Sequence, residues 1–136
     1  NIIGSITKNV FFCSIEFIKQ VKTYGSIVNI GSNSTSTLNA SNLLYIACKA
    51  SVESLTKTLA AHYGPKIKCN CVLPGLTLSN ITKSSPSRFT SVLNKTPLNE
   101  LCTPQDIAQC VYFLTMESNF INGECIKVDG GRTLYS

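Results

Sequence analysis

Apolar residues recur at spacings of three and four in the first stretch of the chain. Over residues 2–21 this spacing predicts a helix with one buried stripe. The stripe consists of Ile2, Ile3, Ile6, Val10, Cys13, Phe17 and Val21. We expect the helix to end near Tyr24 and Gly25, because the β-branched run at residues 26–30 predicts a buried strand bounded by glycines.

A second helix and a second strand follow in the same order. The apolar and small residues of the segment 44–62 predict a helix, which Gly64 and Pro65 stop. The short apolar run at residues 67–73 then predicts a strand, which a Pro-Gly pair breaks. The helical pattern and the strand pattern therefore alternate along the chain.

The last part of the chain repeats this order. Thr103 is followed by a proline and by Asp106, which predicts a capped helix running to about residue 116. Residues 123–128 predict a third strand. Strands separated by helices pair in parallel through crossover connections, so we expect an α/β fold that forms one domain over residues 1–136.

Two polar stretches interrupt the alternation. Residues 32–42 are rich in Ser, Thr and Asn and predict a loop. Residues 77–97 show no sustained periodicity, and a loop of that length is a candidate lid over a binding site.

The composition fits a globular domain: 43% of the 136 residues are hydrophobic. The chain has no signal peptide and no apolar run long enough to span a membrane, so we expect a reducing, cytoplasmic location without membrane contact. It begins with Asn1 rather than Met, in the middle of a pattern, and we therefore expect it to be a fragment of a longer protein.

The net charge of +5 is spread along the chain without a basic block. Such a surface is compatible with an anionic substrate or cofactor, and equally with a role in solubility alone. Nucleic-acid binding is not expected, because neither a clustered basic face nor an aromatic platform is present.

Seven cysteines, an odd number, lie mostly within apolar runs. We interpret all seven as small buried hydrophobic residues rather than as a disulfide framework. Cys69 and Cys71 are expected on opposite faces of their strand, which would prevent them from sharing a metal ion, so no metal site is predicted.

Tyr45 and Lys49 are the candidate reactive pair. They are four residues apart on the second helix and so share one face of it. An ammonium about 4 Å from a phenol would stabilise the phenolate by roughly 4 kcal/mol, although this spacing also occurs by chance in many helices. Ser32 follows the first strand, at the end where doubly wound sheets bind ligands, and alone it would be interpreted as a turn hydroxyl.

The segment from Gly25 to Ser32, followed by Tyr45 and Lys49, resembles the active-site strand and helix of the short-chain dehydrogenase/reductase family. The segment 70–75 is similar to that family's Asn-x-Val-x-Pro-Gly motif. Residues 120–131 are similar to its closing strand. The similarity spans essentially the whole chain, with 3-oxoacyl-[acyl-carrier-protein] reductase-like members the nearest in appearance. It implies the C-terminal half of a Rossmann-type doubly wound parallel sheet, with three strands and crossover helices.

The resemblance also implies a catalytic tetrad of Asn1, Ser32, Tyr45 and Lys49. Tyr45 would exchange the proton, Lys49 would assist it and hold the nicotinamide ribose, and Ser32 would orient the substrate oxygen. Asn1 would anchor a water that leads protons to the lysine. Asn9 is an alternative to Asn1 for the asparagine position.

The same resemblance implies binding of NAD or NADP. Tyr45 and Lys49 would contact the cofactor from the second helix. Pro74 and Gly75 would pass under the nicotinamide, and Thr77 and Ser79 beyond them would also contact the cofactor. Without the preceding turn, Thr77 and Ser79 would be interpreted as parts of an ordinary solvated loop.

No glycine-rich dinucleotide turn occurs in the chain, so the N-terminal cofactor-binding half, and with it the adenosine site, is expected elsewhere. The leading hypothesis is hydride transfer between the cofactor and a small alcohol or carbonyl substrate, in a homo-oligomer (dimer or tetramer), with this chain inactive alone. The alternative hypothesis is a non-catalytic structural or interaction subunit that retains the residues of the tetrad.

Overall fold

The structure is a computed structural model that describes residues 2–38, 42–79 and 86–135. Its centre is a three-stranded parallel sheet in the order β1-β2-β3, formed by β1 (Gly25–Ile30), β2 (Ile67–Pro74) and β3 (Cys125–Val128). Gly25 is paired with Ile67 at one end of the β1–β2 ladder and Ile30 with Val72 at the other. The predicted α/β class with three parallel strands is confirmed.

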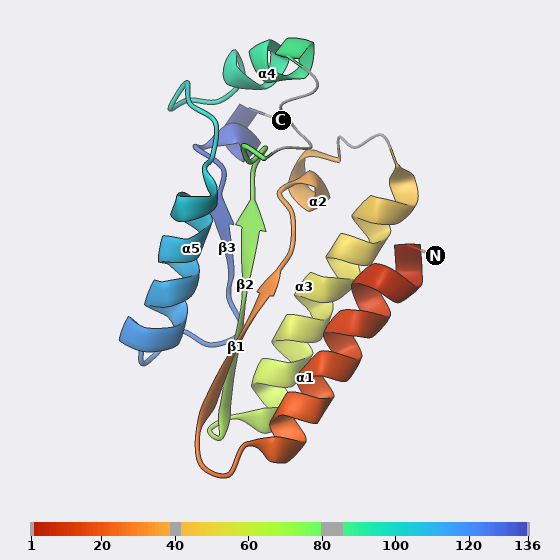
Figure 1. Cartoon of the computed structure of the whole chain (residues 1–136), viewed down its shortest axis with the longest axis vertical. Helices are drawn as coiled ribbons and strands as arrows, with labels where there is room; N and C mark the ends of the chain where they lie inside the picture. Colours follow the sequence, from red (N-terminus) through yellow and green to blue (C-terminus); the bar gives the residue numbers. More distant parts are fainter. Residues whose placement is uncertain (1, 39–41, 80–85, 136) are drawn as a thin grey trace.

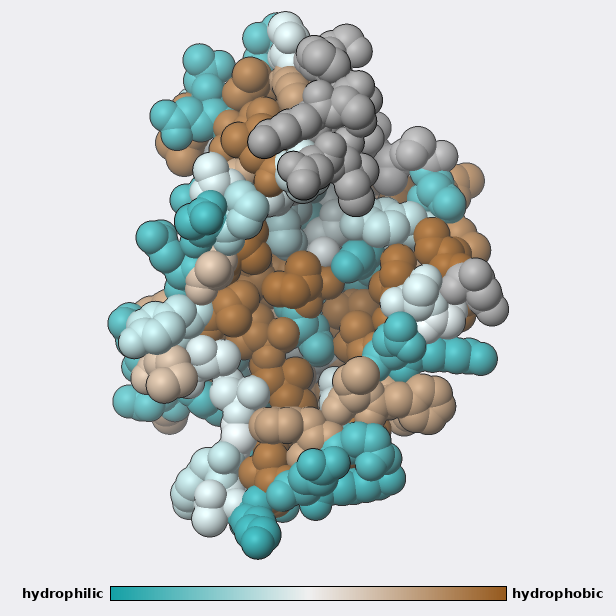
Figure 2. Space-filling model, in the orientation of Figure 1, coloured by the Kyte–Doolittle hydropathy of each residue, from teal (hydrophilic) through white to brown (hydrophobic). Residues whose placement is uncertain are grey.

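Helices cover both faces of this sheet (Figure 1). The long helices α1 (Asn9–Gln20) and α3 (Leu43–Tyr63) lie side by side on one face. The helix α5 (Pro104–Tyr112) lies on the other, and a π-helical segment, η3 (Phe113–Glu117), continues it. In the same orientation, apolar side chains gather down the middle of the molecule, between α5 and α3 (Figure 2). Within the described residues β1 pairs only with β2, so its other edge has no strand beside it.

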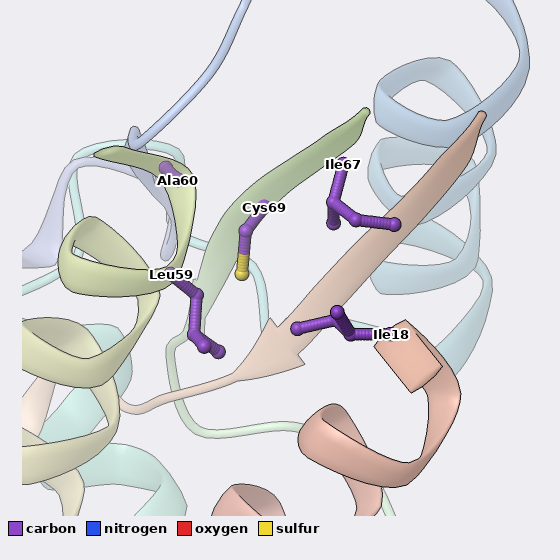
Figure 3. Packing of buried hydrophobic residues seen from close by; sticks show 5 residues of the cluster. All are labelled: Ile18, Leu59, Ala60, Ile67 and Cys69. Carbon is purple, nitrogen blue, oxygen red and sulfur yellow. The ribbon is translucent and has the colours of Figure 1, made fainter. Parts of the chain in front are cut away.

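The core lies between the α1–α3 pair and the sheet. Ile18 of α1 and Leu59 of α3 pack against Ile67 and Cys69 of β2, together with Ala60 (Figure 3). Ile67 and Cys69 have no exposed surface at all. Burial of such apolar surface is the main favourable contribution to the free energy of folding.

The cysteine predictions are partly wrong. Cys69 packs against Leu59, and Cys71 packs against Val52, and both partners belong to α3. The two thiols thus share one face of β2, because side chains two residues apart in a strand point the same way. Cys13 is exposed, so not all seven cysteines are buried.

Helix caps fix two of the helix starts. The side chain of Asn42 accepts hydrogen bonds from the backbone N–H groups of Leu44 and Tyr45, so α3 begins where it places Tyr45 in its first turn. Thr103 and Asp106 form the predicted capping box at the start of α5.

Short helices occur where the sequence suggested only loops. The segment α2 (Ser34–Thr37) follows β1, and α4 (Pro86–Leu93) interrupts the expected 77–97 loop. Phe89, Val92 and Leu93 of α4 have helical spacing and are partly buried, but so short a stripe gives a weak periodic signal. The first long helix also ends earlier than expected, at Gln20.

Side-chain amides tie the β3 region to the rest of the sheet. Asn70, which is fully buried, donates to the carbonyl of Ile121 (2.9 Å) and accepts from the N–H of Glu124 (3.0 Å). Asn122 accepts from the N–H of Cys69 (2.9 Å) and donates to the carbonyl of Ala60 (3.2 Å). These bonds give backbone groups of both segments side-chain partners. None of the helices in the described part of the chain combines the length and apolar character needed to cross a bilayer.

Candidate active site

A cavity of about 940 Å³ opens at the carboxyl end of the sheet. Its walls come from the ends of β1 and β2, the start of α3, the end of α4 and the turn after β3. In parallel α/β sheets this edge is where ligands bind, because the connections to the following helices meet there.

Ser32 stands at the cavity immediately after β1. Its Oγ accepts hydrogen bonds from the backbone N–H of Ser34 (3.2 Å) and from the Ser34 hydroxyl (2.8 Å). A hydroxyl oxygen has two acceptor positions, and both are taken, so the Ser32 proton remains to be donated to a ligand. Gly31 precedes it, and a Cβ there would come within 2.4 Å of Cδ2 of Leu73, so a larger residue at this position would have to displace the Leu73 side chain.

Tyr45 and Lys49 line the same cavity from the first turns of α3. Nζ of Lys49 lies 5.8 Å from the centroid of the Tyr45 ring, within the range of a cation–π contact, and donates to the carbonyl of Ile30 (2.8 Å). Burial lowers the pKa of Lys49 below its ordinary value, and electrostatic interaction with Cys71 opposes that change.

The turn after β2 forms another wall of the cavity, which Pro74, Gly75, Thr77 and Ser79 line. The N–H of Gly75 donates to the carbonyl of Val128 (2.9 Å), which ties the turn to β3. A Cβ on Gly75 would lie 2.9 Å from Cα of Asp129, so this turn has room for glycine alone. Thr77 donates from its hydroxyl to the carbonyl of Gly75 (3.1 Å).

The structure therefore brings together the sequence-predicted residues that it describes, namely Ser32, Tyr45, Lys49, Pro74, Gly75, Thr77 and Ser79. Asn1 lies outside the described residues, and its role stays a prediction. Its alternative, Asn9, is exposed, donates to the carbonyl of Ser5 (3.3 Å) and is not among the residues that line the cavity.

Sequence reasoning missed several residues of the site. Ser34 is buried and bonded to Ser32, and Asn33 donates from Nδ2 to Oδ2 of Asp129 (3.3 Å). Lys95 and Arg132 also line the cavity. A parallel β3 brings its carboxyl end to the same edge as Ser32, so the residues that follow it could have been identified as neighbours of the site.

No group of three or more His, Cys, Asp or Glu side chains that could hold a metal ion is present in residues 2–38, 42–79 and 86–135. The cavity offers hydroxyl, phenol, ammonium and guanidinium groups instead. The fold and this cavity define an α/β protein with a polar site at the carboxyl edge of a parallel sheet.

Comparison with known proteins gives the family. The family model described as "Enoyl-(Acyl carrier protein) reductase" matches residues 3–133. The chain is 39% identical over 119 residues to the 7alpha-hydroxysteroid dehydrogenase of Bacteroides fragilis, covering 82% of this chain and 45% of that relative. It is 32% identical over 130 residues to the short-chain dehydrogenase/reductase homolog YusR of Bacillus subtilis, covering 93% of this chain and 99% of that relative.

Among solved structures, that of a 4-hydroxyisoleucine dehydrogenase mutant complexed with NADH and succinate superimposes with a TM-score of 0.84. The sequences are 30% identical, and the match covers 91% of this chain and 54% of that one. The chain belongs to the short-chain dehydrogenase/reductase family. It spans less than half the length of the hydroxysteroid dehydrogenase, whereas it matches nearly all of YusR.

Proposed function

We propose that this chain is the catalytic portion of an NAD- or NADP-dependent oxidoreductase that interconverts an alcohol and a carbonyl compound. The observation that carries the proposal is the convergence of Ser32, Tyr45 and Lys49 on one cavity, opposite the Pro74-Gly75 turn. The names of the relatives support it, since they include a hydroxysteroid dehydrogenase and a 4-hydroxyisoleucine dehydrogenase that was solved with NADH.

The donor set of the cavity fits the nicotinamide half of such a cofactor. Lys49 and Tyr45 would hold the ribose hydroxyls, and Thr77 and Ser79 would contact the carboxamide. The glycine at position 75 leaves backbone rather than side chain at the turn, so a flat ring can approach it closely. The bound cofactor supplies or accepts the hydride. The residues that would hold the adenosine half have no counterpart in this sequence.

The chain's own residues handle the proton and the substrate oxygen. Ser32 donates its hydroxyl proton to that oxygen, because Ser34 already occupies both of its acceptor positions. Tyr45 gives its phenolic proton to the oxygen during reduction and takes it back during oxidation, as a general acid and base. Lys49 places a positive charge beside Tyr45, which stabilises the phenolate left after proton transfer.

We further propose a homo-oligomer, a dimer or tetramer, assembled through the outer surfaces of α1 and α3. Phe11 and Phe12 support this, because their rings pack edge to face at 5.4 Å and remain 42% and 59% exposed on α1. A reducing, cytoplasmic compartment is also proposed, since all seven cysteines are free thiols.

Cofactor binding tests the enzyme against the non-catalytic alternative. NADH and NADPH are titrated into the natural full-length protein, with binding followed by the fluorescence of the dihydronicotinamide ring. We expect saturable binding of at least one of them, and Lys49→Met should weaken it, whereas Lys22→Met, at the opposite end of the sheet, should not. If the full-length protein bound neither NADH nor NADPH, the proposed enzymatic function would be overturned and a structural or interaction subunit would be favoured.

A further inference from the structure

Of the residues that the structure describes, three cationic side chains and no acidic side chain line the cavity. Its cations are Arg132, at the start of the short 3₁₀ helix η4 (Arg132–Tyr135) that follows β3, Lys95 after α4 and Lys49 on α3. The seven acidic residues of the chain all lie in the described part, and none of them is among the lining residues. A concave site with charges of one sign raises the local concentration of ligands of the opposite sign.

The guanidinium of Arg132 carries an unsatisfied hydrogen-bond donor among the described residues. Its Nη1 is closed off from solvent and has no hydrogen-bond partner in the described part of the chain. A buried guanidinium N–H without an acceptor is unfavourable, because the group has given up its bonds to water. Arginine meets carboxylates and phosphates with paired N–H groups. The Arg132 side chain is only partly buried and lines the cavity, so turning it toward an anionic ligand there would give Nη1 the missing acceptor.

The nearest acid along the chain, Asp129, does not supply it. Asp129 is buried, and its carboxylate accepts from Nδ2 of Asn33 (3.3 Å), the N–H of Gly131 (3.0 Å) and the N–H of Thr133 (3.1 Å). Asp129 forms no ion pair with Arg132, because Lys19 and Glu16 make the one ion pair among the described residues. Its charge offsets part of the positive charge nearby, and the cavity still carries more cations than anions.

Lys95 and Lys49 differ in what already engages them. Nζ of Lys49 donates to the carbonyl of Ile30 and lies beside the Tyr45 ring, which assigns it to the reaction centre. Lys95 is exposed at the end of α4, and its ammonium makes no hydrogen bond or ion pair within the described residues. Among the described residues that line this cavity, Arg132 and Lys95 are therefore the two cations that remain available for an anion from outside the chain.

We propose that Arg132, assisted by Lys95, binds a carboxylate or phosphate group of the substrate, so that the alcohol or carbonyl compound is an anion. This inference rests on the proposed function, in which the same cavity holds substrate and cofactor. The phosphates of the cofactor are the other source of the same chemistry, and the experiment separates the two sources.

The test measures binding to the natural full-length protein by calorimetry. The probes are glutarate, a dicarboxylate, and glutaramide, its neutral counterpart of similar shape. We expect glutarate to bind at least about tenfold more tightly than glutaramide, and Arg132→Gln to remove most of that preference, since a charge-assisted hydrogen bond is lost. Lys95→Gln should reduce the preference less, and Lys22→Gln, the same charge change at the opposite end of the sheet, should leave it unchanged.

Two controls keep the outcome decisive. Circular dichroism melting shows whether each variant folds. Arg132→Lys keeps the positive charge but loses the paired N–H groups of the guanidinium, so it should show an intermediate preference for glutarate over glutaramide. NADH and NADPH affinities are measured on the same variants and should be unchanged. Equal binding of glutarate and glutaramide overturns the inference, as does a glutarate preference that survives Arg132→Gln. Weakened cofactor binding with unchanged glutarate binding would assign Arg132 to the cofactor phosphates and also overturn it. Because glutarate binding needs no turnover, a failure of hydride transfer remains distinguishable.

Discussion

The two ends of the sheet carry different kinds of side chain. At the amino end, Ile67 and Cys69 are wholly buried and pack against Ile18 and Leu59 of the helices. At the carboxyl end, hydroxyl, phenol and cationic side chains surround an open cavity. The comparison separates the sources of stability and of chemistry: apolar burial holds the strands at one end, and the polar groups at the other are left accessible to a ligand.

The largest effect should follow from removing the reactive hydroxyl at the carboxyl end. Tyr45→Phe in the full-length protein should lower kcat by about 10²- to 10⁴-fold, the usual contribution of a general acid or base, while the melting temperature stays nearly constant. The measurement is nicotinamide absorbance with a panel of ketones. Tyr24→Phe is the matched control, because Tyr24 is 81% exposed and lies just before the amino end of β1. Equal activity of Tyr45→Phe and Tyr24→Phe would remove Tyr45 from the mechanism.

The amino end should respond in the opposite way. Ile67→Ala should lower the free energy of unfolding by about 2–5 kcal/mol, because it leaves a cavity in the packed core, while kcat per folded molecule stays unchanged. Urea unfolding followed by circular dichroism measures it. Ile3→Ala is the control at an isoleucine that is 43% exposed, and it should cost much less. If Ile67→Ala impaired catalysis more than stability, the division between the two ends would be wrong.

A smaller effect should appear at the hydroxyl that orients Ser32. Ser34→Ala removes the 2.8 Å bond to Ser32 Oγ, and we expect kcat to fall about three- to tenfold with little change in KM. Ser34→Thr keeps a hydroxyl and should restore most of the activity. A loss of stability without the kcat effect, or no rescue by threonine, would make Ser34 a purely structural residue.

The smallest effect should come from the cap of α5, whose residues neither line the cavity nor belong to the core clusters. Thr103→Ala should cost about 1 kcal/mol of stability near neutral pH. Hydrogen bonds from the Thr103 hydroxyl (2.6 Å) and N–H (2.7 Å) lower the pKa of Asp106. A lowered carboxyl pKa contributes stability above the ordinary pKa and loses it as the pH falls through the folded value, so the effect of Thr103→Ala should shrink in acid.

Thermal melts of the unchanged protein and of Thr103→Ala, from neutral pH down to about pH 3, test this pH dependence. Thr58→Ala serves as the control, because Thr58 is exposed in α3 and its hydroxyl donates to a group that does not titrate, the carbonyl of Ser54. A Thr103→Ala effect that stayed constant down to low pH would contradict the assignment to the capping box.

Features with strong local signals could be predicted from the sequence. The long helices and the β-branched strands gave clear periodicities, and Thr103 with Asp106 gave a capping box that the structure contains. The cavity residues Ser32, Tyr45 and Lys49 were predicted from their resemblance to a family, and their meeting depends on the parallel order of the strands.

Other features depend on contacts between distant segments and could not be predicted in this way. In the sequence Ser34 looks like an ordinary residue of a polar loop. Its place in the site comes from its hydrogen bond to Ser32, which the turn of α2 creates. Arg132 reaches the cavity because β3 ends beside β2. The face shared by Cys69 and Cys71 was predicted wrongly because the alternation of strand side chains was misapplied, not because information was lacking.

In the part of the chain that the structure describes, one edge of β1 has no strand beside it, and this has a consequence for handling the protein. The strand Gly25–Ile30 contains no proline and no charged residue, the features by which natural sheets discourage other strands from adding to an edge. Its outward N–H and C=O groups form a template for intermolecular pairing when nothing covers them. We expect these 136 residues, produced by themselves, to precipitate increasingly as their concentration rises.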